Sequence, residues 1–185
     1  MSIPKNVINH LKKLKVPYEA VTHRTVFTAY DLAQTLKIKL NDIAKTLLVK
    51  VDKEYKLVVL PAKQKLDMAK LKKLLKAKKV SIAREGEMKT KFNVKPGAIT
   101  PFGTLHKVQV IIDRSLTKSA QALFGAGSFT ESLRIKIKDY LKSEQPVIGS
   151  IGESSGLKLQ ARPAKKKVVK KRAKTKPRKS KPKKK

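Results

Sequence analysis

Histidine and cysteine are the first residue types to examine for chemistry, because imidazole and thiolate groups supply many of the bases, nucleophiles and metal ligands in proteins. The 185-residue sequence contains no cysteine and three histidines, His10, His23 and His106. The histidines form neither an HExxH motif nor any other paired spacing. We therefore predict no metal site, no cofactor and no thiolate chemistry, and we expect each histidine to be an ordinary surface or half-buried residue.

Two glycine-containing segments match parts of known catalytic motifs. Residues 152–156, GESSG, match the G-x-S-x-G of serine hydrolases, but they lie in a Pro/Gly/Ser-rich stretch with no apolar helix after it. Residues 124–128, FGAGS, lack the Lys-Ser/Thr that a phosphate-binding P-loop requires. We assign no hydrolase serine, and FGAGS stays open as either a simple turn or a backbone-lined wall of a site.

The segment VKPGAITPFG, residues 94–103, holds two prolines and two glycines in ten positions. Proline fixes φ and donates no backbone hydrogen bond, whereas glycine adopts conformations that other residues avoid. The segment therefore cannot be a helix or a regular strand. We expect a stiff loop whose backbone is exposed to close approach.

Positive charge dominates the composition, with 46 Lys and Arg against 13 Asp and Glu and a formal net charge of +33. Fourteen of these basic residues lie between Lys165 and Lys185, where there is no acidic residue. Such a charge favours a polyanionic partner, most commonly nucleic acid. A single lysine such as Lys45 carries little information in this composition, which favours a solvent-exposed position for it.

Membrane association and secretion find little support in the sequence. No apolar run approaches the roughly 20 residues needed to span a bilayer, and the N-terminal MSIPKNVINHLKKLK lacks the apolar core of a signal peptide. An anionic membrane surface remains a possible partner, but the basic tail has no apolar face to insert. We expect a cytoplasmic protein, and a localisation role for the tail remains open.

The elements that must position any site are predicted from periodicity and capping. Helices are expected over residues 2–14, 28–36, 67–75 and around 138–142, with Ser2, Thr28 and Asp67 as N-caps. Strands are expected at residues 17–23, 45–51, 55–62, 79–83, 108–113 and 134–137, and residues 52–54 are expected to close a hairpin. This irregular mixture predicts an α/β or α+β domain with a mixed, largely antiparallel sheet.

Composition divides the chain into three expected parts. Residues 1–143 carry the periodic apolar pattern of a folded domain. Residues 144–163 are Pro/Gly/Ser-rich and predict a flexible linker. Residues 164–185 are of low complexity and predict a disordered tail, because like charges repel and little apolar mass is present.

Taken in order, six segments resemble the YbaK/prolyl-tRNA synthetase editing-domain family over roughly residues 5–142. They are FTAYDLA (27–33), AKTLLVK (44–50), VVLPAKQKLDMAKLKKLL (58–75), PGAITPFG (96–103), VQVIIDRSL (108–116) and GAGSFTESLRI (125–135). The resemblance implies a barrel-like α/β fold with surrounding helices. It also implies an aminoacyl-tRNA deacylase, which is an ester hydrolase acting in trans.

The resemblance assigns roles to particular residues. It implies that Lys45 holds the tRNA 3′ end and that Gly97 begins the G-x-x-x-P loop, and we take both as catalytic. The implied substrate-binding residues are Phe27, Thr28, Thr46, Ala98, Ile99, Thr100, Pro101, Gly127 and Ser128. Cys-tRNA deacylases of the family carry an acidic residue after the second glycine loop, where this sequence has Arg134 with Glu131 nearby.

The expected reaction is the attack of water on the ester carbonyl of mischarged tRNA. Backbone N–H groups of the stiff loop are suited to meet the developing oxyanion, and the family is thought to position water through the ribose hydroxyl of the substrate. Ala-, Cys- or Ser-tRNA, on tRNA-Pro, are the expected substrates, and an aminoacyl-tRNA synthetase is a possible partner. The oligomeric state is not predicted.

The basic tail is expected to help capture tRNA. The nucleic-acid-binding residues that we assign there are Lys165, Lys166, Lys167, Lys170, Lys171 and Arg172. An alternative reading is a non-catalytic nucleic-acid- or ribosome-binding protein on an editing-domain fold. The retention of Lys45 and of the whole 97–101 loop favours the deacylase.

Overall fold

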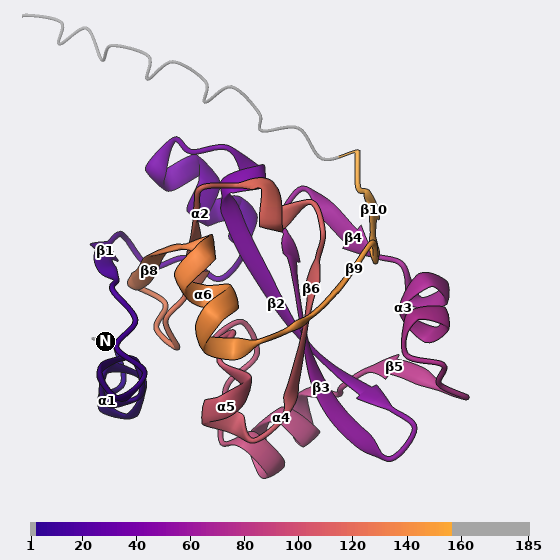
Figure 1. Ribbon diagram of the computed structural model, residues 1–185. Coiled ribbons are helices and arrows are strands. Elements are labelled where there is room, and N and C mark those ends of the chain that lie inside the picture. The colour runs from indigo at the N-terminus through magenta and orange to yellow at the C-terminus, as the bar shows by residue number, and fades with distance from the viewer. Residues whose placement is uncertain (1–2, 157–185) are drawn as a thin grey trace, which may run out of the picture.

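The computed structural model describes residues 3–156, which form a mixed sheet surrounded by helices (Figure 1). The strands of the main sheet lie in the order β1-β8-β7-β2-β3-β6-β9, and β5 also pairs with β2. Neighbouring strands are mostly antiparallel, whereas the pairs β2–β7, β3–β6 and β6–β9 are parallel. The strand bounds are β1 Glu19–Thr22, β2 Ile43–Val51, β3 Glu54–Pro61, β5 Val80–Ile82, β6 Gln109–Asp113, β7 Gln121–Gly125, β8 Glu131–Lys136 and β9 Val147–Gly149. This arrangement confirms the predicted fold class.

Two of the helices begin at caps that the sequence predicts, the first helix begins later than predicted, and the helices over residues 85–92 and 103–106 were not predicted. Thr28 Oγ1 accepts a hydrogen bond from the Asp31 N–H, and Asp67 Oδ1 accepts one from the Lys70 N–H. The first helix begins after Pro4, and the predicted cap Ser2 lies outside the described residues. The helix bounds are α1 Lys5–Lys13, α2 Ala29–Leu36, α3 Met68–Leu74, α4 Glu85–Phe92, α5 Gly103–His106 and α6 Ile137–Glu144, with short 3-10 helices η1 Leu40–Asp42 and η2 Leu116–Lys118. No helix within residues 3–156 is long and apolar enough to cross a membrane.

Alternation along β2 builds a core on both faces of the sheet. Leu48 belongs to a large buried cluster that includes Leu11 of α1 and Tyr140 of α6. The next residue, Val49, points to the other face and belongs to a cluster with Leu71 of α3. Successive side chains of a strand point to opposite faces, so a strand buried on both sides needs a continuous apolar run. In β2 the apolar run Leu47-Leu48-Val49 meets this need, whereas Lys45, Thr46 and Lys50 lie in its less buried positions.

One edge of β2 pairs with two different strands, each over part of its length. Its start, Ile43 and Ala44, pairs in parallel with β7, and its end, residues 49–51, pairs antiparallel with β5. On the opposite edge β2 pairs with β3 over its whole length from Ala44 to Val51. Residues 45–47 therefore lie in a fork between β7 and β5, where the edge of the sheet is open.

The structure differs from the predicted linker over residues 144–156. Residues 147–149 form β9 beside β6, and β10 (Gly152–Ser154) pairs with β4 (Gln64–Leu66). Ile151 is fully buried, and the carboxylate of Asp113 accepts hydrogen bonds from the N–H groups of Ile151 and Gly152. The apolar residues within this Pro/Gly/Ser-rich stretch thus complete the fold. The rest of the predicted linker and the predicted tail, residues 157–185, lie outside the described residues.

Candidate functional site

A cavity of about 320 Å³ opens in the fork of β2, between β5 and β7. Its walls come from β2, α2, the 96–99 segment and the 125–132 segment. The apolar lining residues are Val26, Phe27, Ala29, Leu32, Ile43, Ala44, Leu47, Leu48, Ile82, Ala83, Met88, Pro96 and Ile99. The remaining lining residues are His23, Thr28, Lys45, Thr46, Gly97, Gly125, Ser128 and Ser132. An apolar cavity with a few convergent polar groups is the usual form of a small-ligand site.

Lys45 lies at this cavity and not on an ordinary solvated face. Its ammonium group donates a hydrogen bond of 2.6 Å to the backbone carbonyl of Gln64. Burial disfavours the charged form and, with repulsion from Lys65, lowers the pKa of Lys45 below that of an ordinary lysine. A half-buried cation that makes this single hydrogen bond to the backbone is available to an anionic or carbonyl group of a ligand.

Thr46 is the most informative polar residue of the lining. Within residues 3–156, its Oγ1 is the one buried side-chain oxygen or nitrogen that has no hydrogen-bond partner. A buried hydroxyl without a partner costs about 1–3 kcal/mol, so such groups are rare in native structures. Thr46 lines the cavity, so its hydroxyl is a candidate partner for a polar group bound there.

Gly97 brings the backbone of the stiff loop close to α2. It has φ +80°, and a Cβ at this position would lie 3.1 Å from the backbone oxygen of Phe27 and 3.5 Å from the ring of Phe129. The left-handed conformation and the close approach both favour glycine. The loop consequently presents backbone to the cavity at Gly97, with Ile99 as the next lining side chain.

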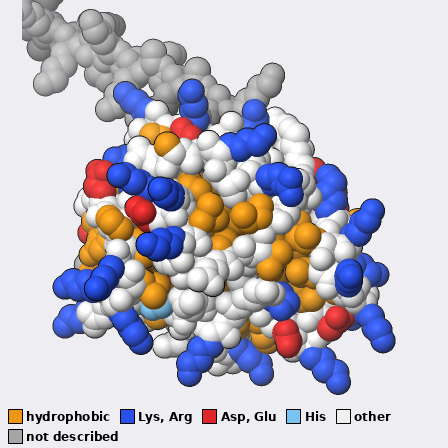
Figure 2. All heavy atoms as spheres, in the orientation of Figure 1, with side chains coloured by type: hydrophobic (Ala, Val, Ile, Leu, Met, Phe, Trp, Pro, Cys, Tyr) orange, Lys and Arg blue, Asp and Glu red, His pale blue; other side chains and the backbone are white. Residues whose placement is uncertain are grey.

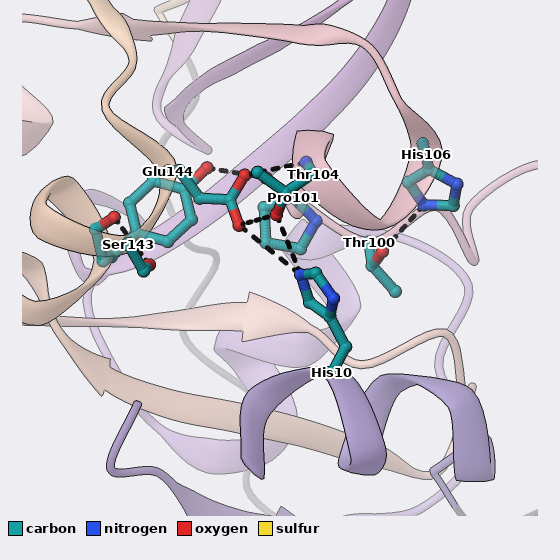
Figure 3. Close-up of polar contacts among 8 residues, drawn as sticks. His10, Thr100, Pro101, Thr104, His106, Ser143 and Glu144 are labelled. Atoms are coloured by element: carbon teal, nitrogen blue, oxygen red, sulfur yellow. Dashed lines mark hydrogen bonds and ion pairs between the residues drawn. The ribbon is translucent and has the colours of Figure 1, made fainter. Parts of the chain in front are cut away.

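The other predicted loop residues lie behind the cavity wall. Thr100 is buried and bonds His106 Nε2 over 2.9 Å, while the backbone carbonyl of Pro101 accepts a 2.7 Å hydrogen bond from the buried Tyr140 hydroxyl (Figure 3). Ala98 is buried, and Gly127 packs near Thr100. The structure thus brings Phe27, Thr28, Lys45, Thr46, Gly97, Ile99 and Ser128 to the cavity, whereas Ala98, Thr100, Pro101 and Gly127 support its wall.

A polar network anchors this wall from behind (Figure 3). The buried carboxylate of Glu144 accepts hydrogen bonds from both the N–H and the hydroxyl of Thr104, at 3.1 and 2.8 Å. His10 Nε2 lies 2.9 Å from the same hydroxyl. Burial, with a contribution from nearby His10, lowers the pKa of His106. These contacts join α1, α5 and α6 at the end of the loop, so they hold the loop in place.

His23 is the one histidine that lines the cavity, and sequence reasoning did not assign it to a site. Its Nδ1 lies 2.9 Å from the carbonyl of Arg24, and its Nε2 lies 2.9 Å from Ser132 Oγ. Both ring nitrogens are engaged, so the imidazole is fixed in place. Ile82 and Met88 were also missed, because β5 and α4 approach the cavity only in the folded chain. Among residues 3–156 no three potential His, Asp or Glu ligands gather around a common point.

Two apolar side chains stand exposed at this cavity, Phe27 at 67% and Ile82 at 56% exposure. The Phe27 ring lies 5.2 Å from that of Phe129 in a tilted arrangement. On the face shown in Figure 2, hydrophobic side chains gather near the middle and Lys and Arg side chains surround them. An exposed aromatic ring at a cavity in so basic a protein is suited to stack on a nucleobase.

Comparison with known proteins identifies similar chains. The family model described as the aminoacyl-tRNA editing domain matches residues 23–143. The prolyl-tRNA editing protein ProX of Acetoanaerobium sticklandii is 29% identical over 122 residues, which are 63% of this chain and 74% of that protein. The multifunctional Ser/Thr-tRNA deacylase ProXp-y of Escherichia coli K12 is 28% identical over 134 residues, which are 70% of this chain and 80% of that protein.

A solved structure of similar fold is that of a candidate trans-editing enzyme for prolyl tRNA synthetase. It superimposes with a TM-score of 0.71 and 18% sequence identity, and the match covers 83% of this chain and all of that one. At this identity the likeness concerns the fold.

Proposed function

Because this chain belongs to the aminoacyl-tRNA editing domain family, we propose that it is a deacylase that hydrolyses mischarged aminoacyl-tRNA in trans. In this reaction water adds to the ester carbonyl, the bond between that carbon and the ribose oxygen breaks, and the ribose oxygen takes up a proton. The products are a free amino acid and uncharged tRNA. The relatives named as a prolyl-tRNA editing protein and as a Ser/Thr-tRNA deacylase support this assignment.

The observation that carries the proposal is the unpartnered hydroxyl of Thr46, next to Lys45 in the chain, in a mainly apolar cavity that both residues line. An aminoacyl ester offers an α-amino group, a carbonyl and ribose oxygens, any of which can satisfy that hydroxyl. We assign to Lys45 the role of an electrostatic clamp on the 3′ nucleotide or on the ester. Lys45 does not need to transfer a proton, because the ribose hydroxyl of the substrate can orient the water.

The backbone of the loop at Gly97 is the proposed support for the transition state. Water attack converts the planar carbonyl into a tetrahedral centre with a developing oxyanion, which preorganised N–H groups stabilise by about 3–4 kcal/mol per donor. The absence of a side chain at Gly97 lets an ester approach the backbone closely. The network behind Thr100 and Pro101 keeps that backbone from relaxing around another substrate.

The size of the cavity supports a small aminoacyl group. About 320 Å³ lies at the lower end of the range of ligand pockets, which starts near 300 Å³. Part of that volume must also receive the ribose. We propose Ala-, Cys- or Ser-tRNA as substrates, on tRNA-Pro. One methylene changes the binding free energy in a pocket by only about 1–3 kcal/mol. Discrimination between aminoacyl groups of similar size must therefore come from rigid walls that exclude the larger group.

The remaining assignments concern the nucleic acid. We propose that the exposed ring of Phe27 stacks on the terminal base, with Thr28 and Ser128 contacting the same end of the substrate. The basic residues 165–172 lie outside the described part of the chain, and we propose that they raise the rate of tRNA capture by electrostatic attraction. A synthetase is a proposed partner, because a mischarged tRNA must be intercepted after its release.

Replacing Thr46 with valine tests whether the Thr46 hydroxyl contacts the substrate. Valine has nearly the same shape and removes an unpartnered hydroxyl, so we expect an unchanged or slightly higher melting temperature. We expect kcat/KM for deacylation to fall about tenfold, as lost hydrogen bonds of 1–1.5 kcal/mol imply. The measurements are thermal unfolding and initial rates of ester loss from charged tRNA.

Thr46→Ser is the matched control, since it keeps the hydroxyl and should retain most of the activity. If Thr46→Val hydrolyses charged tRNA at the full rate, then the hydroxyl makes no contact with the substrate and the proposed geometry is wrong.

A further inference from the structure

A second, polar cleft of about 570 Å³ lies beside the cavity. We call it the lysine cleft, because Lys39, Lys63 and Lys118 line it and all three are exposed. They come from three separate segments, namely the loop before η1, the turn between β3 and β4, and η2. The other lining residues are Asn41, Asp42, Pro61, Gln64, Ser115, Ser119 and Ser154. The cleft therefore combines three ammonium groups with hydroxyl and amide groups, and Pro61 is the one apolar residue among those that line it.

Gln64 connects this cleft with the cavity. Gln64 is part of the lining of the lysine cleft, and its backbone carbonyl accepts the hydrogen bond from the Lys45 ammonium. Lys45 in turn lines the cavity. The Lys45–Gln64 hydrogen bond thus joins a lining residue of the cavity to a lining residue of the cleft.

The described part of the chain ends close to the same cleft. Ser154 of β10 lines the cleft, and the described chain ends two residues later at Gly156. The following sequence carries 14 Lys and Arg between positions 165 and 185 and no acidic residue. The pairing of β10 with β4 therefore places the end of the described chain at the cleft.

We propose that the lysine cleft binds the phosphate backbone of the tRNA acceptor end, while the terminal aminoacyl nucleoside enters the cavity beyond Lys45. This inference rests on the proposed function for the nature of the ligand. Ammonium groups on three separate segments suit a chain of phosphates better than one phosphate, and polar walls suit a solvated backbone better than a base. Asp42 contributes a single negative charge against the three lysines.

The test neutralises two of the lysines in the full-length protein. The variant Lys63→Gln/Lys118→Gln is compared with Lys107→Gln/Lys138→Gln, which removes the same charge from exposed positions that line neither the cleft nor the cavity. The dissociation constant for uncharged tRNA and for an acceptor-stem hairpin is measured at several salt concentrations. Thermal unfolding establishes that both variants are folded.

We expect the cleft variant to bind RNA about tenfold more weakly at physiological salt. We also expect the slope of log K against log salt to become shallower by about 1.4–1.8, which corresponds to two lost phosphate contacts at 0.7–0.9 each. The control variant should lose markedly less affinity and slope. Equal losses in both variants would overturn the proposal, because they would indicate a general effect of net charge.

Binding of uncharged RNA needs no hydrolysis, so the two proposals can fail separately. A selective loss of RNA binding in a protein without deacylase activity would support the cleft and contradict the proposed enzyme. Deacylation that continues with an unchanged KM in the cleft variant would contradict the cleft and leave the enzyme standing.

Discussion

Lys45→Met is expected to reduce the single-turnover rate of deacylation by about 100-fold or more, the range seen when one transition-state contact is removed. Methionine keeps the apolar stem of the side chain and removes the ammonium group. Burial lowers the pKa of Lys45, which means that folding disfavours its charge. The variant should therefore remain folded. Rates with saturating enzyme separate this chemical effect from weaker binding of tRNA.

The pH dependence of the wild-type and Lys45→Met deacylation rates gives a second test of the role of Lys45. If the ammonium form is active, the ratio of wild-type to Lys45→Met rates falls as pH rises through the pKa of Lys45. Because this pKa is lowered, the fall should occur below the range of an ordinary lysine. Taking the ratio cancels the hydroxide dependence that both proteins share. A ratio near one at neutral pH would show that the Lys45 ammonium contributes nothing to deacylation.

Gly103→Ala is expected to have the largest effect on stability, with a loss of about 3 kcal/mol in the free energy of unfolding. A Cβ at Gly103 would lie 2.3 Å from the backbone oxygen of Val108 and 2.4 Å from Val110 Cγ2. Backbone cannot move aside as the end of a long side chain can. For a folded unit of this size the melting temperature should fall by about 6–12 °C.

Gly86→Ala is the control for this prediction. A Cβ at Gly86 meets nothing within 4 Å, and the residue lies in α4, where alanine has the higher helix propensity. The substitution should leave the melting temperature unchanged or raise it slightly. Equal melting temperatures for the Gly103 variant and the wild type would show that the α5–β6 junction can open without cost.

The local signals in the sequence predicted most of the framework around the cavity. The Thr28 and Asp67 caps and the β2–β3 hairpin all form as capping and β-branched patterns indicate. Such features depend on residues that are close in sequence, so a single chain is sufficient to find them. They place the start of α2 and the middle of β2, which are two sides of the cavity.

Other elements form through contacts that are distant in sequence. Helix α4 has a weak amphipathic pattern, but Glu87 accepts hydrogen bonds from the Tyr55 hydroxyl at 2.6 Å and from the Arg84 N–H at 2.8 Å. With the nearby Lys50 ammonium, these bonds lower the pKa of Glu87 to about 2. Strands β9 and β10 likewise depend on Asp113, which lies more than thirty residues earlier. No local pattern contains this information.

The residues of the candidate site also divide into those that the sequence identified and those that depend on how the chain packs. The resemblance selected Lys45 and Gly97 from a lysine-rich and glycine-containing sequence, which composition alone could not do. It did not separate the loop residues that face the cavity from Ala98, Thr100 and Pro101 behind it, because that depends on how the loop packs on α5 and α6. The fork that creates the cavity depends on β5 and β7 sharing one edge of β2.

The most direct test of the central claim is ester hydrolysis by the purified full-length protein. Ala-, Cys-, Ser- and Pro-tRNA-Pro are incubated separately with the wild type and with Lys45→Met, and the remaining ester is followed over time. We predict rapid loss of at least one small aminoacyl group, retention of Pro-tRNA-Pro, and loss of the activity in the variant. Stable esters throughout, together with tight and salt-sensitive binding of tRNA, would contradict the deacylase and favour a non-catalytic RNA-binding protein on the same fold.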